Sequence, residues 1–236
     1  MAKLGIPKRI ILKVSGEAFG DGHEHAESIA SNIQLALNEN IQVGVVVGGG
    51  NIFRGAAAEK LGFQRAPADY VGMLATAING LILSQALHNK AISNRVMSSF
   101  AIPGITERYH WQQARDYLGR GDVVIFVGGT GNPFFTTDTT GALRASEVEA
   151  DLLLKATKVD GIYDKDPKQH SDAQKFDKLT YAEALTRDLK VMDGAAIALC
   201  RDNQIPIYVF NLFQDGALKQ AICHQEGGTL VSGETA

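Results

Sequence analysis

The sequence predicts an α/β fold: a three-layer α/β/α sandwich around a mostly parallel sheet. Short apolar runs recur along the chain, and each has the length of a buried strand. Longer segments lie between these runs, and their apolar residues recur at intervals of three and four, as in amphipathic helices. Because strands and helices alternate almost throughout, the strands are expected to run parallel, with ligands gathered at their carboxyl ends.

The elements can be assigned in chain order. The segments predicted as strands are Arg9–Val14, Gln42–Val47, Ile92–Met97, Val123–Val127, Asp151–Ala156 and Ile205–Phe210. Helical spacing runs from Ile29 to Leu37 and from Val71 to Gln85. The most apolar long stretch, Met73–Leu87, is shorter than the ~20 residues of a membrane span, so a buried helix is expected. Residues 159–179 are expected to form loops or a hairpin.

Length and composition restrict the class of protein. The 236 residues suffice for one large core, and no shift in composition marks a linker, so a single domain over residues 1–236 is expected. The 23 Lys+Arg against 26 Asp+Glu give no basic excess, which argues against nucleic acid or a membrane surface as a partner. Cys200 and Cys223 form no Cys-x-x-Cys pair, and Met1–Arg9 lacks an export signal, so a cytoplasmic protein is expected.

The segment Thr130–Asp138 is predicted to be a ligand loop. It follows the strand Val123–Val127 through two glycines, and it combines threonines, an asparagine, a proline, two aromatic residues and a carboxylate. Its polar groups suit a sugar and a phosphate. Phe134 and Phe135 either form the wall of a base pocket or fill core beneath the loop, and core filling is the commoner use of paired aromatics.

A second glycine-rich turn is a candidate phosphate cradle. Gly48-Gly49-Gly50-Asn51 follows an apolar strand and precedes Arg54, so consecutive N–H groups and a helix amino terminus are expected to face one anion. The alternative is an ordinary tight turn, but three consecutive glycines favour close backbone approach. Ala56-Ala57 replaces the Lys and Ser/Thr of a P-loop, and no G-x-G-x-x-G motif occurs at this turn, so neither nucleotide-binding motif is supported.

Lys13 is a candidate phosphate-binding cation. Ile10, Leu12 and Val14 alternate along one face of the first strand, so Lys13 points to the other face, beside the turn Ser15-Gly16. The alternative is a surface ion pair. Phosphoryl transfer requires cations and backbone donors that align donor and acceptor while neutralising oxygen charge, and these turns offer both.

Two aspartates are predicted near the reacting groups. Asp138 ends the ligand loop, and Asp193 precedes Gly194 at a predicted helix start. Each could instead cap a helix, which is the commoner role of an aspartate at that position. His23 and His25 flank Glu24, but no third ligand lies nearby, so no metal is assigned to them.

Two motifs together resemble the signature of the amino acid kinase superfamily. They are the turn from Lys13 to Gly16 and the segment from Lys155 to Pro167. The chain is more closely similar to the bacterial uridylate kinase family, from Arg9 to Leu230. That similarity rests on Gly48–Gly55, Asp69 with Gly72–Thr76, Thr130–Asp138 and Leu189–Asp193.

This resemblance implies an amino acid kinase-like fold and phosphorylation of UMP to UDP by ATP with Mg²⁺, in pyrimidine nucleotide biosynthesis, by a cytoplasmic homohexamer. The implied ATP contacts are Lys13, Val14, Ser15, Gly16, Gly50, Arg54, Thr157, Tyr163 and Asp166. The implied UMP contacts are Gly49, Asp69, Thr130, Gly131, Asn132, Pro133, Phe134, Phe135, Thr136 and Thr137. The catalytic set is Lys13, Arg54, Asp138 and Asp193, with Lys13 bridging phosphates and no direct metal ligand assigned.

Individual roles within this set are also implied by the resemblance. Asp138 orders the reacting centre, and the ring of Tyr163 borders adenine. Asp69 accepts from ribose hydroxyls, with an N-cap as its alternative. One departure concerns regulation: the segment after Glu17 is shorter than in many relatives, which weakens the case for allosteric activation by GTP. Inhibition by UTP carries over more readily because UTP can compete through the UMP pocket.

Two other readings stay open at this point. A kinase of the same superfamily could phosphorylate a carboxylate or a carbamate, although the Thr130 loop argues against such an acceptor. A protein of another class could bind a nucleotide or oxyanion without turnover. Retention of Lys13, Arg54 and Asp138 favours catalysis over binding alone.

Overall fold

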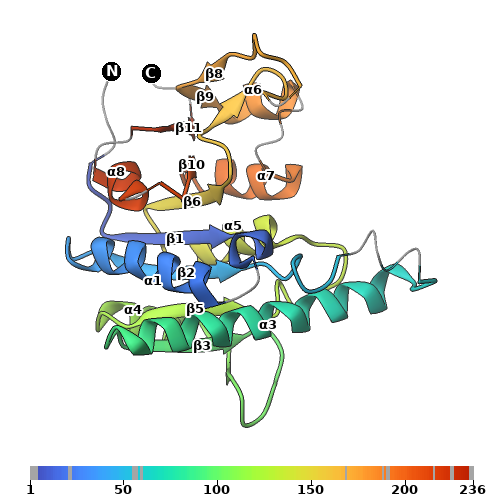
Figure 1. Cartoon of the computed structure of the whole chain (residues 1–236), viewed down its shortest axis with the longest axis vertical. Coiled ribbons are helices and arrows are strands. Elements are labelled where there is room, and N and C mark those ends of the chain that lie inside the picture. The colour runs from blue at the N-terminus through green and yellow to red at the C-terminus, as the bar shows by residue number, and fades with distance from the viewer. Residues whose placement is uncertain are drawn as a thin grey trace.

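A computed structural model of the chain describes residues 5–20, 23–54, 58, 61–167, 169–187, 189, 192–214, 216–223 and 226–233. At its centre lies a nine-stranded sheet with the order β4-β3-β5-β2-β1-β6-β10-β11-β9 (Figure 1). The strands are β1 Arg9–Val14, β2 Gln42–Val47, β3 Asn94–Ser98, β4 Glu107–Arg108, β5 Val123–Val127, β6 Leu152–Thr157, β9 Lys178–Thr180, β10 Ile207–Asn211 and β11 Gly228–Ser232. A separate two-stranded sheet pairs β7 (Ile162–Tyr163) with β8 (Lys175–Phe176).

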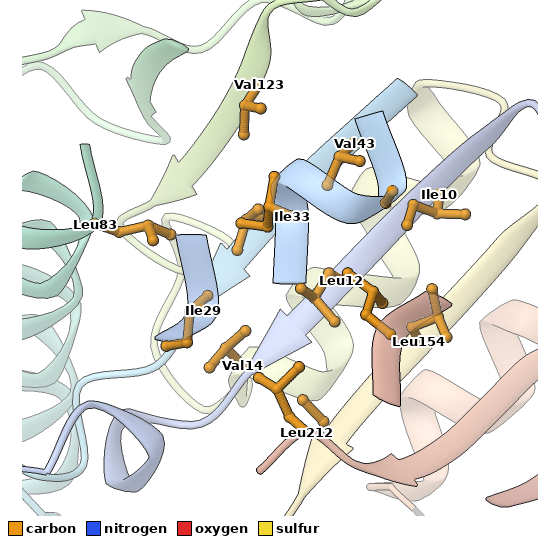
Figure 2. Close-up of a cluster of buried hydrophobic side chains, with 14 of the residues drawn as sticks. Ile10, Leu12, Val14, Ile29, Ile33, Val43, Leu83, Val123, Leu154 and Leu212 are labelled. Atoms are coloured by element: carbon orange, nitrogen blue, oxygen red, sulfur yellow. The ribbon is translucent and has the colours of Figure 1, made fainter. Parts of the chain in front are cut away.

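Helices cover both faces of the large sheet. They are α1 His23–Leu37, α3 Arg65–Asn89, α4 Trp111–Gly119, α5 Thr137–Glu147, α6 Tyr181–Thr186, α7 Gly194–Asp202 and α8 Ala217–Cys223, with a 3₁₀ turn, η1, at Gly16–Phe19. One buried cluster joins the sheet to α1, α3 and α8, and the other joins it to α4, α5, α6 and α7. Figure 2 shows part of the first cluster, in which Leu12 and Val14 of β1 lie near Ile29 of α1. The predicted three-layer sandwich is confirmed.

The predicted strands all form, with small shifts at their ends. The bounds predicted for β1, β2 and β5 match the structure, whereas β3, β6 and β10 begin one or two residues later than predicted. Ile10, Leu12 and Val14 belong to one buried cluster and Ile11 to the other, which confirms the predicted alternation along β1. The antiparallel pair of β7 and β8 confirms a hairpin within residues 159–179. The short strands β4, β9 and β11 were not predicted.

The long helix α3 corrects one expectation. It has 25 residues, and by length and composition alone it is apolar enough to cross a membrane. Half of its most apolar window is buried, and Leu74, Ile78 and Leu81 are exposed at 49%, 49% and 39%. The expected buried helix is therefore buried on one side only, the side that packs against α1, β3 and β5.

The sheet topology gathers the glycine turns and polar loops at one edge. β1 pairs in parallel with β2 and β6, and β2 pairs in parallel with β5. Their last residues, Val14, Val47, Val127 and Thr157, therefore end at the same edge of the sheet. The turns that follow these strands are the segments in which the sequence predicted ligand-binding residues, as parallel sheets require.

Candidate active site

A cavity of about 750 Å³ opens at this carboxyl edge, between the strand turns and the amino-terminal half of α3. The predicted site residues that line it are Ser15, Gly16, Gly49, Gly50, Arg54, Asp69, Phe135, Thr136 and Thr137. The other lining residues are Glu17, Gly48, Phe53, Phe63, Arg65, Ala68, Gly72, Met73, Thr76 and Gly129. Segments distant in the sequence thus form one cavity.

The glycine turns after β1 and β2 pack backbone against backbone. A Cβ atom on Gly16 would lie 2.3 Å from the Gly50 nitrogen, and one on Gly48 would lie 2.6 Å from the Gly16 nitrogen. Such distances exclude any side chain, so the predicted close approach is confirmed, and its partner is the neighbouring turn. The N–H groups of Ile52 and Phe53 bond to the Gly49 carbonyl at 3.0 Å, which closes a turn after the cradle. Residues 55–57 of the predicted helix start lie outside the described residues.

Lys13, Asp138 and Lys155 form a buried charge cluster beside the cavity. Lys13 and Lys155 face each other in the register of β1 and β6, and their ammonium groups lie 2.7 Å and 2.8 Å from the two oxygens of Asp138. The three side chains are 8%, 16% and 12% exposed in the order Lys13, Lys155, Asp138. The Lys13 pair is therefore a buried ion pair, and the alternative of a surface pair was wrong.

Burial and the neighbouring charges together shift the pKa values of Asp138 and Lys155. Burial alone would raise the pKa of Asp138, but the ammonium groups of Lys13 and Lys155 outweigh it and hold that pKa below its ordinary value. Burial lowers the pKa of Lys155, and the Lys13 charge adds to that effect against the opposing attraction of Asp138. The side-chain cap of α5 is Thr136, whose hydroxyl accepts from the Asp138 N–H at 3.0 Å, so the cap alternative for Asp138 was wrong.

Asp193 joins two helices. Its carboxylate accepts from the Ala196 N–H at 2.8 Å and caps α7, which confirms the cap alternative. The same carboxylate accepts from the hydroxyls of Thr136 and Thr139, the second at 2.9 Å. Asp193 is not among the residues that line the cavity, so the structure places it where it orients the start of α5. Its predicted catalytic role stays a prediction.

Asp69 fastens the ligand loop to α3. Its carboxylate accepts from the Phe134 N–H at 2.7 Å and pairs with Arg65 Nε at 2.9 Å. The Arg65 guanidinium lies 5.5 Å from the centroid of the Phe134 ring. Because Gln64 is the N-cap of α3, the cap alternative for Asp69 was wrong.

The two loop phenylalanines are not core residues. Phe134 is 67% exposed and Phe135 is 51% exposed, so the expectation that they fill core was wrong. Phe134 has a φ of 73°, and this left-handed conformation turns the loop so that both rings lie outside the core. Phe135 lines the cavity, which fits a pocket wall, whereas Phe134 stacks against Arg65.

Several predicted residues lie outside the cavity lining. Thr157, Tyr163 and Asp166 follow the carboxyl end of β6: Thr157 accepts from the Val159 N–H at 3.1 Å, and the Tyr163 hydroxyl donates to Asp160 at 2.6 Å. Asp166 accepts from Gln169 at 3.0 Å. Lys13, Val14 and Asp138 lie beside the cavity, and Thr130, Gly131, Asn132, Pro133 and Phe134 form the outer part of the loop.

Sequence reasoning assigned no role to Lys155, Arg65, Thr76 or Glu17. A signal existed for Lys155, because a lysine within Leu152–Thr157 interrupts an otherwise apolar strand as Lys13 does in β1. Arg65 precedes Asp69 by four residues, the spacing of a helical ion pair. Thr76 and Glu17 gave no comparable signal, since their contacts come from segments far away in the chain.

The donor groups do not form a preassembled metal site. Among the described residues no three His, Cys, Asp or Glu side chains converge, and each oxygen of Asp138 faces a lysine. Mg²⁺ binds proteins through one or two carboxylates together with substrate phosphates. A magnesium ion bound in this way would need phosphate oxygens of a ligand in addition to a carboxylate of the site.

Comparison with known proteins agrees with this geometry. Residues 8–211 match the sequence model of the amino acid kinase family. The chain therefore belongs to the amino acid kinase family, whose fold it shares.

Within that family the chain belongs with the uridylate kinases. It is 50% identical over 233 residues to a uridylate kinase of Protochlamydia amoebophila, which covers 95% of this chain and 93% of that protein. A uridylate kinase of Actinobacillus pleuropneumoniae is 48% identical, covering 96% and 98%. The crystal structure of a UMP kinase from Bacillus anthracis superposes with a TM-score of 0.93 at 39% identity and covers 97% of both chains.

Proposed function

We propose that this chain transfers the γ-phosphoryl group of ATP to UMP, giving UDP and ADP. The observation that carries the proposal is the cavity in which the glycine turns and the ligand loop meet, with the Lys13–Asp138–Lys155 cluster beside it. Its uridylate kinase relatives span nearly the whole chain. The transfer is an in-line displacement: a phosphate oxygen of UMP attacks the γ-phosphorus of ATP, and the bond from that phosphorus to the bridging oxygen of ADP breaks.

The donor side of the site supplies N–H groups and positive charge. The turns at Ser15-Gly16 and Gly48–Gly50 place backbone against the cavity, and Arg54 lines it beside Gly50. Lys13 and Lys155 neutralise negative charge on the transferred group, and Asp138 keeps both ammonium groups in place between transfers. Thr157, Tyr163 and Asp166 hold the adenosine of ATP at the neighbouring strand end.

The acceptor side suits a nucleotide. Asp69 accepts from the ribose hydroxyls, Phe135 borders the base, and Gly49 with residues 130–137 surrounds the ribose and phosphate. A carboxylate acceptor would meet the negative charge of Asp69, which disfavours the kinases of this family that act on carboxylates. The same carboxylate attracts hydroxyl groups, and UMP carries two on its ribose.

Further parts of the proposal concern the working enzyme. We infer a cytoplasmic homohexamer of pyrimidine nucleotide biosynthesis that uses magnesium with ATP and is inhibited by UTP through the acceptor pocket. Activation by GTP is not part of the proposal, because the segment after Glu17 is short. Asp193 acts on the reaction by holding the start of α5.

A nucleotide panel tests the function. The chain is incubated with ATP, magnesium and UMP, CMP, AMP or GMP, and formation of each diphosphate is measured with and without UTP or GTP. UDP formation should exceed the other products by at least an order of magnitude. Comparable turnover of CMP or AMP would contradict the acceptor assignment, and nucleotide binding without any turnover would favour a non-catalytic protein.

A further inference from the structure

Two buried polar side chains on α3 form hydrogen bonds to the two segments that line the cavity: one binds the phosphate cradle and the other binds the start of the ligand loop. Asn79 is fully buried and Thr76 is 2% exposed, although both lie on a helix face that packs against an apolar sheet. A buried polar group is costly unless it is hydrogen-bonded, so the partners of these two side chains define what they do.

Asn79 binds the phosphate cradle. Its amide nitrogen donates to the Gly48 carbonyl at 2.7 Å and to Asn51 Oδ1 at 2.8 Å. The Gly48 carbonyl and the Gly49 N–H belong to one trans peptide and point in opposite directions. Fixing the carbonyl on α3 therefore directs the Gly49 N–H away from Asn79 and sets the plane of the cradle.

Thr76 binds the start of the ligand loop. Its hydroxyl donates to the Met73 carbonyl at 2.6 Å and accepts from the Gly128 N–H at 2.7 Å. Gly128 has a φ of 78° and directly precedes the loop that follows β5. The threonine therefore fixes the peptide from which residues 130–137 leave the sheet.

Two glycines, Gly49 and Gly80, allow α3 to come close enough for these bonds. A Cβ on Gly49 would lie 2.8 Å from the Ala75 Cβ and 2.8 Å from the Gly72 carbonyl oxygen. A Cβ on Gly80 would lie 2.4 Å from Val127 Cγ1. The helix backbone thus touches both the cradle and β5, with Thr76 and Asn79 less than one helical turn apart between them.

We propose that Asn79 and Thr76 are positioning residues with different effects on the two substrates: Asn79 orients the cradle, in which Gly49 faces UMP and Gly50 faces ATP, and Thr76 orients the loop for UMP alone. The inference rests on the proposed function, because it takes from it the nucleotides that Gly49, Gly50 and the loop contact. Neither side chain touches the reacting atoms. Each acts through a backbone group that does line the cavity or leads into it.

Kinetic constants of matched variants test the proposal. Thr76→Val keeps the side-chain shape but leaves the Gly128 N–H unsatisfied, and it should raise the KM for UMP about ten-fold with the KM for ATP within two-fold. Thr76→Ser retains the hydroxyl and should restore the wild-type KM. Asn79→Leu should raise the KM values for both nucleotides about ten-fold, because it releases the Gly48–Gly49 peptide and the Asn51 side chain together.

Two further variants separate positioning from stability. Asn51→Ala removes one partner of Asn79 but keeps the bond from Asn79 to the Gly48 carbonyl, so it should raise the KM for ATP more than the KM for UMP and lower the melting temperature less than Asn79→Leu does. Ser84→Ala removes an α3 side-chain bond to Asn94 that lies away from the cavity, and it should change neither KM.

The outcomes are decisive in either direction. Thr76→Val and Asn79→Leu variants that lose stability while both KM values stay within two-fold, or a Thr76→Val variant that raises both KM values equally, would overturn the assignment. Calorimetric titration of ATP and of UMP, each without the other, makes the same comparison without turnover. A wild-type chain that binds both nucleotides but makes no UDP contradicts the proposed function alone. The affinities of the variants for ATP and for UMP then still decide the positioning roles.

Discussion

Lys13 and Lys155 lie side by side on adjacent strands, and the carboxylate of Asp138 bridges their ammonium groups. Two like charges so close together in a buried position would repel strongly without a counter-charge. In the proposed function, the two ammonium groups neutralise charge on the transferred phosphoryl group, and Asp138 pairs with them between turnovers.

Loss of Lys13 should affect turnover far more than folding. Lys13→Ala removes charge neutralisation in the transition state, and kcat should fall by about two to three orders of magnitude. Lys155 remains to pair with Asp138, so the free energy of unfolding should fall by only about 1–3 kcal/mol. Steady-state kinetics and urea denaturation measure the two effects, with Lys219→Ala, which breaks an exposed ion pair, as the control. A Lys13→Ala variant with near-normal kcat would refute the role.

Loss of the Asp138 charge should destabilise the fold. Asp138→Asn leaves two buried ammonium groups without a counter-charge, and the free energy of unfolding near neutral pH should fall by about 3–5 kcal/mol. Urea denaturation measures this difference. Asp172→Asn, which changes an exposed pair with Lys165, should cost less than about 1 kcal/mol.

The pH dependence of the same variant gives a second check. The folded-state pKa of Asp138 lies below the ordinary value of 3.8, so its contribution to stability is present above that value and is lost as the pH falls through the folded-state pKa. The Asn variant lacks this contribution at every pH. The stability difference between wild type and variant should therefore narrow in acid, and a difference that stays constant down to the lowest folded pH would contradict the ion pair.

Glu17 should compete with phosphate for Arg54. The two side chains form an ion pair at the cavity, where both are about half exposed. Glu17→Gln should release Arg54 and lower the KM for ATP by about two- to five-fold at low salt, and added salt should shrink the difference. Glu39→Gln, which breaks an exposed pair with Lys219, should leave the KM unchanged. A KM that rises in Glu17→Gln would show that Glu17 assists ATP binding.

Gly80 should tolerate no side chain. Gly80→Ala places a Cβ against Val127 Cγ1, so α3 must move from β5, and the free energy of unfolding should fall by about 1–3 kcal/mol. Gly119→Ala, at the end of α4, meets no atom within 4 Å and should be neutral or stabilising by up to about 1 kcal/mol. Thermal unfolding of the two variants compares them directly, and equal melting temperatures would mean that the α3–β5 contact is not tight.

Sequence reasoning succeeded where local periodicity determines the outcome. The alternation around Lys13 correctly separated it from Ile10, Leu12 and Val14, because a strand sends successive side chains to opposite faces. The glycines at 48 and 49 were correctly read as close backbone approach, because only glycine fits such a contact, whereas a Cβ on Gly50 would meet no atom closer than 4.0 Å. Both features depend on a few adjacent residues.

The remainder depended on contacts between distant segments. Lys155 joins Lys13 only through the pairing of β1 with β6, which no local pattern specifies. The exposure of Phe134 and Phe135 follows from a left-handed residue and from the bond between Asp69 and the loop, and neither is visible in composition. Asp193 was correctly placed at a helix start, but its bonds to Thr136 and Thr139 required the packing of α7 on α5.

The neighbourhood of β1 also has a consequence for the order of folding during synthesis. Its partner β2 follows soon after it in the chain, whereas β6 and the helix that carries Asp138 are made much later. A nascent chain that has not yet released α5 holds the Lys13 ammonium on an apolar strand with no counter-charge. Release of β6 then brings Lys155 to the same carboxylate, so we expect the cluster, and with it the pairing of β1 with β6, to form late in synthesis.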